Sequence, residues 1–494
     1  MLAALGFVAC FEKDGEKTTS TAPSTTTKTD PGCDKYEQGV KLSRGRGYIF
    51  GNEVQKNQDG SVIIKFSFDN GGTGQMALEA DNIEEITPRQ CVKRRISSVT
   101  LSGDSSCAIV ADALQCWGNN DFGQLGDGTT TNRPAPVQVV PSGVIKVAMY
   151  TNQTCVNVGG ALQCWGNNSL GQLGDGTTTN RPAPVQVISS GVTDMSMYAM
   201  GEGNCAIVGN TIAGGTLKCW GMNTTGNVGD GLHTGEEYPG PRLTPVQPIS
   251  SGVTSVVMGM DYTCAIVSSA LQCWGKNSWG QFADNRLLAF SWTPVQAIPS
   301  NVTALATGEN HICAIVNSAL QCWGLNAYGY GQVGDGGING NATPPIQVIP
   351  PGVTAVSVFE HYTCAIVNSA LQCWGRNTYG QIGDGTTIHR LTPVTVIPSH
   401  VTAVAMGFNH ACAIVGEALQ CWGGNPFGQL GDGTTISRLT PVQVIPSGVT
   451  SVAVGTSHTC ATVNNALQCW GRNTYGQVGD GTTTDRLSPV LVIR

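Results

Sequence analysis

Cysteine thiols are the groups in this sequence with the clearest chemical potential, either as metal ligands or as disulfides. The chain has 19 cysteines in 494 residues, and sixteen of them fall into eight local pairs. Zinc sites usually place their ligands two to four residues apart, and none of these pairs is so close. We therefore favour disulfides over zinc or free thiols. The pairs, which we number as repeats 1 to 8, are Cys107 with Cys116, Cys155 with Cys164, Cys205 with Cys219, Cys264 with Cys273, Cys313 with Cys322, Cys364 with Cys373, Cys412 with Cys421, and Cys460 with Cys469.

The spacing within each pair is typical of a β-hairpin with a short turn. In CAIVNSALQC (313–322) the central Asn317-Ser318 reads as a two-residue turn, which sets Cys313 opposite Cys322. Counting outward from the turn, the cysteines fall on a pair without backbone hydrogen bonds, where Cα atoms lie about 4.5 Å apart. That distance is within disulfide range. In the longer third pair, Ile207 still faces Leu217 when the cysteines face each other.

The amino-terminal residues read as a leader and a linker. Residues 1–10 (MLAALGFVAC) are apolar, too short to span a bilayer, and end on Cys10. They resemble the end of a bacterial lipoprotein signal, which implies that Cys10 carries a lipid. An ordinary secretory signal remnant or a frayed terminus is the alternative. Residues 11–32 are rich in Ser, Thr and Pro and are predicted to be a linker without a core.

Residues 33–91 read as a separate small β domain. Strand-like runs alternate with Gly-containing turns, which predicts a small β-barrel, and Cys33 and Cys91 bracket it as a further disulfide pair. The run resembles Tudor-like or SH3-like modules, and that resemblance implies an aromatic cage for a cationic group. The four aromatic residues of such a cage would be Tyr48, Phe50, Phe66 and Phe68. We favour the alternative that they fill the core, because a domain this small needs its aromatic residues for packing.

From residue 96 to 494 the sequence repeats with a period of about fifty residues. Each repeat contains four strand-like pieces, which predicts an all-β fold: a β-propeller of eight four-stranded blades. Seven blades with one displaced unit is the alternative. One blade cannot bury both of its faces, so neighbouring blades must form the core, and the tryptophan of each CWG motif is expected to pack between them. These residues are Trp117, Trp165, Trp220, Trp274, Trp323, Trp374, Trp422 and Trp470.

The repeat pattern CAIV…LQCWGxNxxGQLGDGTT…R…TPV is similar to the repeats of the regulator of chromosome condensation family, over about four-fifths of the chain. Members of that family form toroidal propellers, usually with seven blades. Some exchange nucleotide on a small GTPase and bind chromatin, and a secreted bacterial relative inhibits a β-lactamase. The resemblance therefore implies the fold, while function has to be argued from the residues.

Charge and motifs exclude several function classes. Residues 1–95 hold 13 of the 26 basic and 13 of the 33 acidic residues, which leaves 13 basic and 20 acidic residues for the propeller. With no basic stripe, no nucleic-acid partner is expected. The sequence contains no GxSxG, HExxH, CxxC or Walker-type motif, so we expect no catalytic site, cofactor or metal. The recurrent Asp of GDG, one per loop, reads as a turn residue rather than a calcium ligand.

Two features suggest a surface for recognition. The residue two before the first cysteine varies among repeats (His311, His410 and His458 in three of them), which suggests a position on the rim. Repeats 3 to 5 also depart from the common loop pattern, and repeat 4 carries WGQFADNRLLAFSW (279–292). Aromatic and arginine side chains on a rigid ring favour partner binding, against the alternative that the aromatic residues turn inward. The candidate residues are Tyr262, Trp279, Phe282, Arg286, Phe290, Trp292, Tyr328, Tyr330 and Tyr362.

The sequence thus predicts a non-enzymatic, monomeric scaffold that binds a protein partner outside the cytoplasm, held to a membrane only by a lipid on Cys10 or secreted. One alternative is a secreted enzyme or protein inhibitor acting at the propeller face, and an enzyme there would need clustered Asp and Glu on the central rim. Another is an intracellular nucleotide-exchange factor, which the predicted disulfides disfavour.

Overall fold

The computed structural model describes the backbone of six strands between residues 38 and 88, and residues 96–493 apart from 198–202, 210–213, 233–239, 284–289, 327 and 339. The chain divides into two units, Met1–Arg94 and Arg95–Arg494. The described part contains no helix, and therefore none that could cross a membrane.

The strands of the first unit form two antiparallel three-stranded sheets, ordered β2-β1-β6 and β3-β4-β5. They are β1 (Gln38–Leu42), β2 (Tyr48–Gly51), β3 (Glu53–Lys56), β4 (Val62–Ser67), β5 (Thr73–Leu78) and β6 (Ile83–Pro88). No pairing joins the two sheets among these strands, so the closed barrel stays a prediction. The aromatic cage, the pair of Cys33 and Cys91, and Cys10 all fall outside the described side chains.

The second unit is a β-propeller. Its first four blades use β7 (Ile96–Ser102), β8 (Ser105–Val110), β9 (Ala113–Gly118), β10 (Arg133–Val140), β11 (Val144–Tyr150), β12 (Gln153–Val158), β13 (Ala161–Gly166), β14 (Arg181–Ile188), β15 (Val192–Met197), β16 (Gly203–Val208), β17 (Gly215–Gly221), β18 (Arg242–Gly259), β19 (Tyr262–Val267), β20 (Ala270–Lys276) and β21 (Phe290–Ile298). Its last four use β22 (Val302–Thr307), β23 (His311–Val316), β24 (Ala319–Leu325), β25 (Asn341–Ile349), β26 (Val353–Phe359), β27 (Tyr362–Val367), β28 (Ala370–Gly375), β29 (Arg390–Ile397), β30 (Val401–Met406), β31 (His410–Val415), β32 (Ala418–Gly423), β33 (Arg438–Ile445), β34 (Val449–Val454), β35 (His458–Val463), β36 (Ala466–Gly471) and β37 (Arg486–Ile493).

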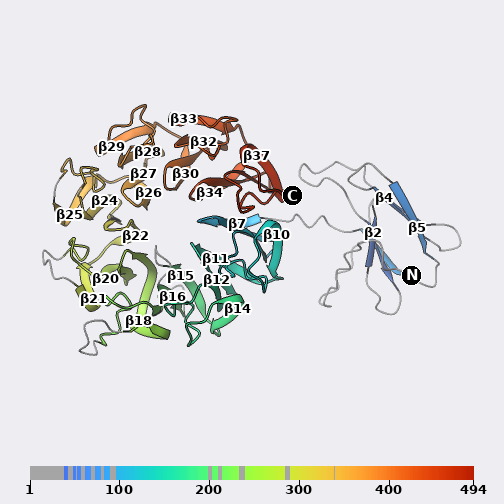
Figure 1. Cartoon of the computed structure of the whole chain (residues 1–494), viewed down its shortest axis with the longest axis horizontal. Helices are drawn as coiled ribbons and strands as arrows, with labels where there is room; N and C mark the ends of the chain where they lie inside the picture. The colour runs from blue at the N-terminus through green and yellow to red at the C-terminus, as the bar shows by residue number, and fades with distance from the viewer. Residues whose placement is uncertain are drawn as a thin grey trace. The chain divides into compact units, whose positions relative to one another are not determined.

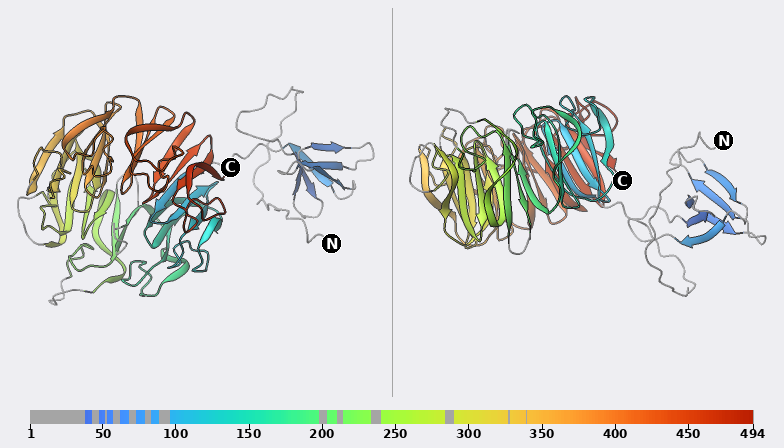
Figure 2. Two further views of the ribbon diagram at one scale, coloured as in Figure 1. Left: turned by 45° about the horizontal axis from the view of Figure 1, so that its top comes forward. Right: turned by 90° about the horizontal axis from the view of Figure 1, so that it is seen from below.

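Each repeat lays its strands from the axis outward in chain order (Figure 1). The first strand, such as β26 or β30, lies nearest the axis, and the fourth, such as β29 or β33, lies on the outside. Seen from the side, the blades stand next to one another as a short cylinder (Figure 2). The outermost strands contain proline, for example Pro393 in β29, which removes a backbone donor from an exposed sheet edge.

Eight repeats appear as seven hydrogen-bonded sheets, because β18 serves two blades. Six sheets have four strands, and one has seven, ordered β15 to β21. The longer hairpin of repeat 3 explains the shared strand. It places Gly215 opposite Val253, so the ladder of blade 3 continues along β18 into the part that pairs with β19 of blade 4.

The hairpin register predicted from the cysteines is confirmed. Val316 pairs with Ala319 and Cys313 with Cys322. Asn317 and Ser318 both have positive φ, 52° and 63°, as a type I′ turn requires.

The sixteen cysteines of the repeats form eight disulfides, each within a single blade, and in every one the Cα atoms lie 4.1 Å apart. The pairing is the one that the spacing predicts, so both members of each pair are confirmed as disulfide cysteines. The bonds join Cys107 to Cys116, Cys155 to Cys164, Cys205 to Cys219, Cys264 to Cys273, Cys313 to Cys322, Cys364 to Cys373, Cys412 to Cys421, and Cys460 to Cys469.

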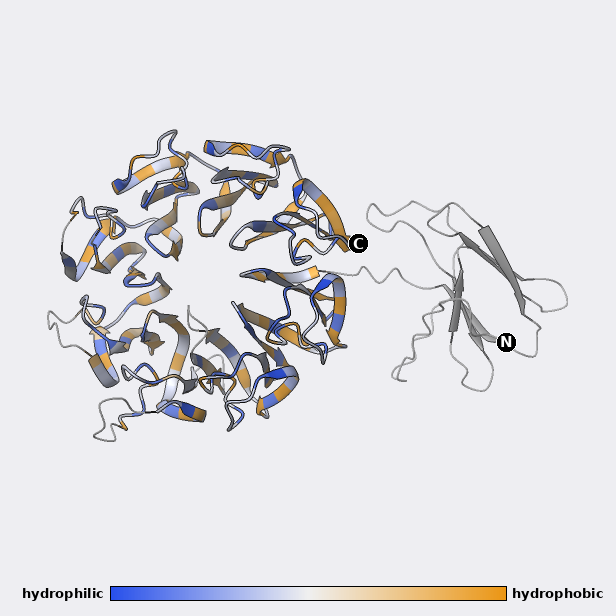
Figure 3. Cartoon of the chain, in the orientation of Figure 1, coloured by the Kyte–Doolittle hydropathy of each residue, from blue (hydrophilic) through white to orange (hydrophobic). Residues whose placement is uncertain are grey.

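The hydrophobic core lies between neighbouring blades rather than inside any one of them. Eight clusters of buried residues are present in the described propeller, and each joins two consecutive repeats. Apolar and polar residues are interspersed along the strands (Figure 3), and the second strand of a blade, such as β8, is buried along its whole length because a neighbouring blade covers each of its faces. One cluster unites Ile96 and Trp117 of repeat 1 with Ile493 of repeat 8, so the last strand packs beside the first blade.

The tryptophan of every CWG motif links two blades. Its side chain is buried, and its Nε1–H donates to a backbone carbonyl in the preceding repeat, at 2.8–3.0 Å in all eight cases. The bond from Trp117 to the carbonyl of Gln477 closes the ring, since these residues belong to the first and the last repeat. The prediction that tryptophan packs between blades is therefore confirmed.

Two neighbouring glycines provide a test of this closure. Gly479 and Gly481 have φ of +84° and +83°, so alanine is equally strained at both. A Cβ on Gly479 would lie 2.5 Å from Nε1 of Trp117, whereas one on Gly481 would meet nothing within 4 Å. We expect G479A to lower the free energy of unfolding by about 1–3 kcal/mol more than G481A does, measured by denaturant unfolding. Equal losses in the two variants would contradict this role of Trp117.

Candidate functional site

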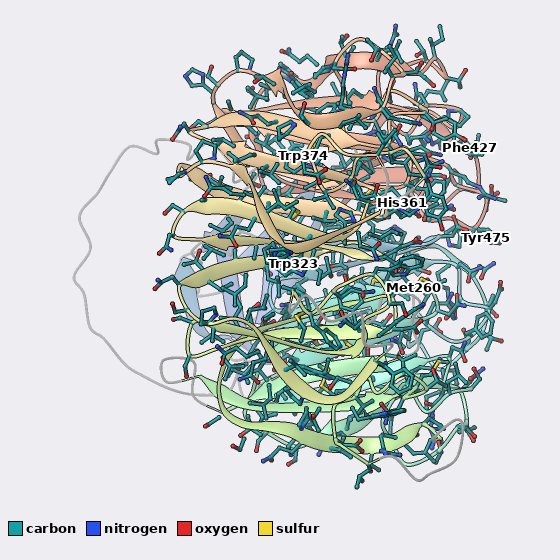
Figure 4. The ribbon with its side chains drawn as sticks, turned by 90° about the vertical axis from the view of Figure 1, so that its left-hand side faces the viewer. Met260, Trp323, His361, Trp374, Phe427 and Tyr475 are labelled. Carbon is teal, nitrogen blue, oxygen red and sulfur yellow. A yellow bond between two sulfur atoms is a disulfide. The ribbon has the colours of Figure 1, made fainter. Side chains whose placement is uncertain are left out.

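One end of the propeller carries the long loops, and we call it the loop face. Because strands alternate in direction, the turn after strand 1 and the loop after strand 3 of each repeat emerge at the same end. His361, Phe427, Tyr475 and Met260 lie toward this end, while Trp323 and Trp374 lie within the blades (Figure 4). A surface built by the loops after strand 3, such as the one that follows β20 in repeat 4, is therefore on this face.

The GDG aspartates build the long loops. Asp127 accepts hydrogen bonds from the backbone N–H and the hydroxyl of Thr129, and Nε of Arg133 lies 2.6 Å from its carboxylate. Burial raises the pKa of Asp127, but the bonds from Thr129 and Arg133 outweigh this, and the pKa falls below its ordinary value. The same ion pair recurs in five other repeats, between Asp175 and Arg181, Asp230 and Arg242, Asp384 and Arg390, Asp432 and Arg438, and Asp480 and Arg486. The turn-forming interpretation of these residues is confirmed.

A glutamine in each typical loop fixes the residue two positions before it. The side chain of Gln477 accepts a hydrogen bond from the N–H of Tyr475 at 2.9 Å, while its backbone carbonyl accepts the Trp117 bond. The equivalent contact holds Phe122 against Gln124 at 3.0 Å. The loop residue is thus positioned by the same glutamine that joins the blades.

This loop position is aromatic in six of the eight repeats, from repeat 4 around the ring to repeat 1. The glutamine contact is absent only from repeat 5 among these six, where the Gln332 side chain has no partner among the described residues. Leu170 and Thr225 occupy it in repeats 2 and 3. These side chains are all partly exposed; Tyr379 is 42% and Phe122 37% exposed. We call the six residues the aromatic arc: Trp279, Tyr330, Tyr379, Phe427, Tyr475 and Phe122.

Arginine side chains lie over pairs of consecutive rings in the arc. The guanidinium carbon of Arg376 is 6.0 Å from the ring centroid of Tyr330 and 5.9 Å from that of Tyr379. Arg472 lies 5.3 Å from Phe427 and 5.9 Å from Tyr475 in the same way. These are cation–π distances. The arc is therefore an ordered surface of rings and guanidinium groups.

Acidic residues lie on the turns nearest the axis, and we call these turns the axial rim. Glu360 lies 3.6 Å from Arg376, and Asp104 lies 4.0 Å from Arg472. The other two contacts are Asp261 with Lys276 at 3.5 Å and Glu309 with His361 at 3.7 Å. The arc and the acidic rim are thus parts of one surface.

The rim carboxylates are close enough to influence one another. Burial raises the pKa of Glu360 to about 7, the charge of Glu309 adds to this effect, and Arg376 opposes it. The pKa of Tyr150, at the end of β11 in repeat 2, is raised by burial and then by Glu360 and Glu309. Burial lowers the pKa of His361, and Arg376 lowers it further against the pull of Glu309. His361 is therefore neutral at pH 7.

The position two before the first cysteine does not face solvent, and the expected recognition site at Tyr262 and Tyr362 is wrong. Both tyrosines are buried, and their hydroxyl groups donate to the next blade: Tyr262 to the carbonyl of Gly308 at 3.2 Å, and Tyr362 to that of Gly407 at 2.7 Å. Histidines at this position bridge the blades through Nε2. The pairs are His311 with Thr363 at 3.0 Å, His410 with Thr459 at 2.9 Å and His458 with Ser106 at 3.0 Å.

Of the loop residues predicted for partner binding, one is buried and several are exposed or partly exposed. Phe282 is 1% exposed and belongs to the core between blades 4 and 5, so its assignment to the surface is wrong. Tyr328 is 68% and Phe290 45% exposed, and the rings of Phe290 and Trp292 meet edge to face at 5.4 Å. Trp279 and Tyr330 are partly exposed members of the arc. Arg286 lies outside the described residues.

The remaining residues of the arc were missed from sequence, although a signal was present in the aromatic residue two before the glutamine of GQ. No group of three or more His, Cys, Asp or Glu within the described ranges could hold a metal ion.

Comparison with known proteins agrees with the repeat pattern. The model of the regulator of chromosome condensation (RCC1) repeat matches residues 114–156, 160–208, 371–414 and 419–462, and a second model of that repeat matches 449–477. No curated protein matches the chain. The predicted resemblance of the repeats is thereby confirmed.

Two solved propellers show the same fold. Human WBSCR16 aligns with a TM-score of 0.52 at 20% identity, over 68% of this chain and 94% of its own. Prp20p from Saccharomyces cerevisiae, described together with its binding properties to Gsp1p and histones, aligns with a TM-score of 0.54 at 18% identity, over 74% of this chain and 91% of its own. At such identities the likeness concerns the fold alone.

Proposed function

We propose that this chain, which carries RCC1 repeats, is a non-enzymatic scaffold that binds a protein partner through the aromatic arc and the axial rim of its loop face. The observation that carries the proposal is the arc itself: six partly exposed aromatic side chains at one loop position, five of which have their backbone N–H bound by the glutamine of the loop. Because each of the eight blades is held by a disulfide, the fold presents these side chains without a large loss of conformational entropy on binding.

The composition of this surface is that of a protein-binding hot spot. Tyrosine, tryptophan and arginine are the residues that most often dominate binding energy at protein interfaces. The arc combines them, with Arg376 ordered between Tyr330 and Tyr379. The sequence placed the surface on repeats 3 to 5, whereas the arc extends it from repeat 4 through repeat 8 to repeat 1.

Location outside the cytoplasm is part of the proposal. Eight disulfides inside the blades support an oxidising compartment, because such bonds are rare in reducing ones. Attachment through a lipid on Cys10 remains a prediction, since that residue lies outside the described part of the chain.

The arc can be tested with a substitution that another repeat already tolerates. Repeat 2 has Leu170 where the arc has aromatic residues, so leucine fits this loop position. We expect Y379L/Y475L to weaken partner binding by about tenfold or more, because interface hot spots often contribute 2 kcal/mol or more each. The partner is captured from surface-exposed material with the intact chain as bait, and its affinity is then measured by calorimetry.

The matched control is I145A. Ile145 is 63% exposed but lies at the start of β11, at the end of the blade away from the loop face. Binding should be unchanged in this variant. An affinity that falls equally in both variants, or in neither, would refute the assignment of the arc.

A second candidate function is an enzyme acting on glycans at the axial rim. The observation in its favour is the pair Glu309 and Glu360, one of which has its pKa raised to about 7, since glycoside hydrolysis uses two carboxylates of differing pKa. We favour binding because Arg376 already pairs with Glu360, the carboxyl whose pKa is raised. Glycan cleavage that disappears in E360Q would reverse this preference.

A further inference from the structure

Three repeats place a basic side chain of their own beside a rim acid. The residue three after the second cysteine is Lys276, Arg376 or Arg472 in repeats 4, 6 and 8. In each case its backbone N–H donates to the carbonyl of the turn near the axis, at 2.8, 3.0 and 2.9 Å. The side chain then reaches a rim carboxylate. The propeller thus contains a recurring intramolecular cation site.

Repeat 5 keeps this site but lacks the cation. Leu325 occupies the basic position, and its N–H donates to the carbonyl of Asn310 at 2.9 Å, so the backbone is the same. The acid is retained, because Glu309 stands at the position that Glu360 has in repeat 6. Leu325 is apolar and 2% exposed, and it cannot neutralise this charge.

We propose that the loop face binds an arginine side chain of the protein partner beside Glu309, in the cation site that repeat 5 leaves without a basic residue of its own. This inference rests on the proposed function and names the chemistry by which the partner is recognised.

Aromatic rings at the site favour a planar guanidinium group. The ring centroids of Tyr328 and Tyr330 are 5.9 Å apart, and the ring centroid of His361 lies 6.0 Å from that of Tyr328 and 5.4 Å from that of Tyr330. Tyr328 belongs to an insertion peculiar to repeat 5 and is 68% exposed. Guanidinium groups stack on such rings while pairing with carboxylates, as Arg376 does one repeat further on.

The charges around the site complement a cation. Glu309 and Glu360 contribute two carboxylates, and Arg376 one guanidinium. Tyr150, which faces the carboxylates from repeat 2, and His361 are both neutral at pH 7, since the first has its pKa raised and the second lowered. Because the Glu360 carboxyl loses its proton near pH 7, an arginine should bind more tightly at pH 8 than at pH 6.

The test is to occupy the cation site with an arginine of the chain itself, so that an arginine of the partner is excluded. In L325R the chain supplies the arginine, as it does in repeat 6, and L325M is the neutral control. We expect L325R and E309Q each to weaken binding of the captured partner by about tenfold or more, because charge pairs at interfaces are costly to lose. L325M should bind as the unaltered chain does. N-acetyl-arginine amide should bind the unaltered chain, detected by NMR, whereas the neutral citrulline analogue should not.

Failure of this inference is distinguishable from failure of the proposed function. If Y379L/Y475L loses the partner while L325R and E309Q keep it, the arc binds the partner and the arginine site is refuted. The site is also refuted if the arginine amide binds E309Q as well as the unaltered chain, since its contact is then elsewhere. Circular dichroism of L325R checks that it folds, and E309Q, whose altered side chain is partly exposed, tests the site independently of that outcome.

Discussion

The free energy of unfolding of the propeller should fall steeply as the pH is lowered below about 6.5, the ordinary pKa of histidine. His311, His410 and His458 are at most 1% exposed, and burial lowers the pKa of each to about 3. The neighbouring charge of His361 adds to the effect on His311, and that of His458 to the effect on His410. Each Nε2 bonds a hydroxyl group of the next blade, while Nδ1 has no partner among the described residues.

The sign follows from the lowered pKa. Between pH 6.5 and 3 the unfolded chain binds one more proton per histidine than the folded chain, so acid favours unfolding. The stabilisation is fully present above pH 6.5 and is lost as the pH falls toward the folded value. Each histidine contributes a slope of about 1.4 kcal/mol per pH unit. The raised pKa of Glu360 has the opposite effect, because between pH 4.5 and 7 the folded chain binds one more proton at this residue than the unfolded chain. In that range it cancels the contribution of one histidine to the slope of the free energy of unfolding against pH.

Another repeat shows which residues can replace one of these histidines and its hydroxyl partner. Where a tyrosine replaces histidine, the next blade has an apolar residue in place of the hydroxyl, as in the pair Tyr362 and Ala411. H410Y/T459A copies that pair, and the tyrosine hydroxyl group can reach the carbonyl of Gly455, as that of Tyr362 reaches Gly407.

We expect H410Y/T459A to fold. The slope of its free energy of unfolding against pH should be smaller by about 1.4 kcal/mol per pH unit, the contribution of one proton. Denaturant unfolding followed by tryptophan fluorescence between pH 8 and 4 measures the slope. A slope that is the same with and without His410 would show that this histidine is protonated in the folded chain.

The cysteine pattern predicted the most, because it constrains local geometry. Cys313 and Cys322 with a two-residue turn admit one hairpin register, and repetition of that hairpin requires neighbours to complete the core. The same rule could have corrected the error at Tyr262 and the histidines. Residues two apart on a strand share a face, and since Cys264 is buried, Tyr262 had to be buried with it.

The candidate surface was harder to predict because it is non-local. Phe427 and Arg472 belong to consecutive repeats and meet only when the two blades pack against each other. The contact between Glu309 and His361 also crosses a blade boundary. A sequence alone shows that an aromatic residue recurs at one loop position, but not that the loops emerge at one end around a common axis.

Reduction of the eight disulfides should unfold the propeller at 37 °C. Seven of them join cysteines nine residues apart, and the eighth joins cysteines fourteen apart. Closing so short a loop stabilises the folded chain by roughly 2–3 kcal/mol per bond, through the entropy removed from the unfolded chain. The eight contributions are not additive, yet even half of their total would equal the stability of a typical domain, about 5–15 kcal/mol. Blades that depend on their neighbours for a core should also fail together.

The experiment unfolds the chain in denaturant with and without dithiothreitol, dilutes it, and follows refolding by circular dichroism. We expect only the oxidised chain to recover its thermal transition. Because the cysteines of the described blades are at most 2% exposed, dithiothreitol added to the folded chain should act slowly and require opening of a blade. The variant C364A/C373A removes the disulfide of one blade only. Its free energy of unfolding should fall by about 2–3 kcal/mol plus the effect of a small cavity, which measures the contribution of a single hairpin.

The result also bears on where the protein works. A chain that cannot refold when reduced needs an oxidising compartment, which agrees with a scaffold outside the cytoplasm. If the reduced chain instead recovers the same transition, and mass spectrometry finds free thiols in native material, the interfaces formed by Trp117 and its seven equivalents suffice for the ring. The disulfides would then carry no information about location, and an intracellular exchange factor would again have to be considered.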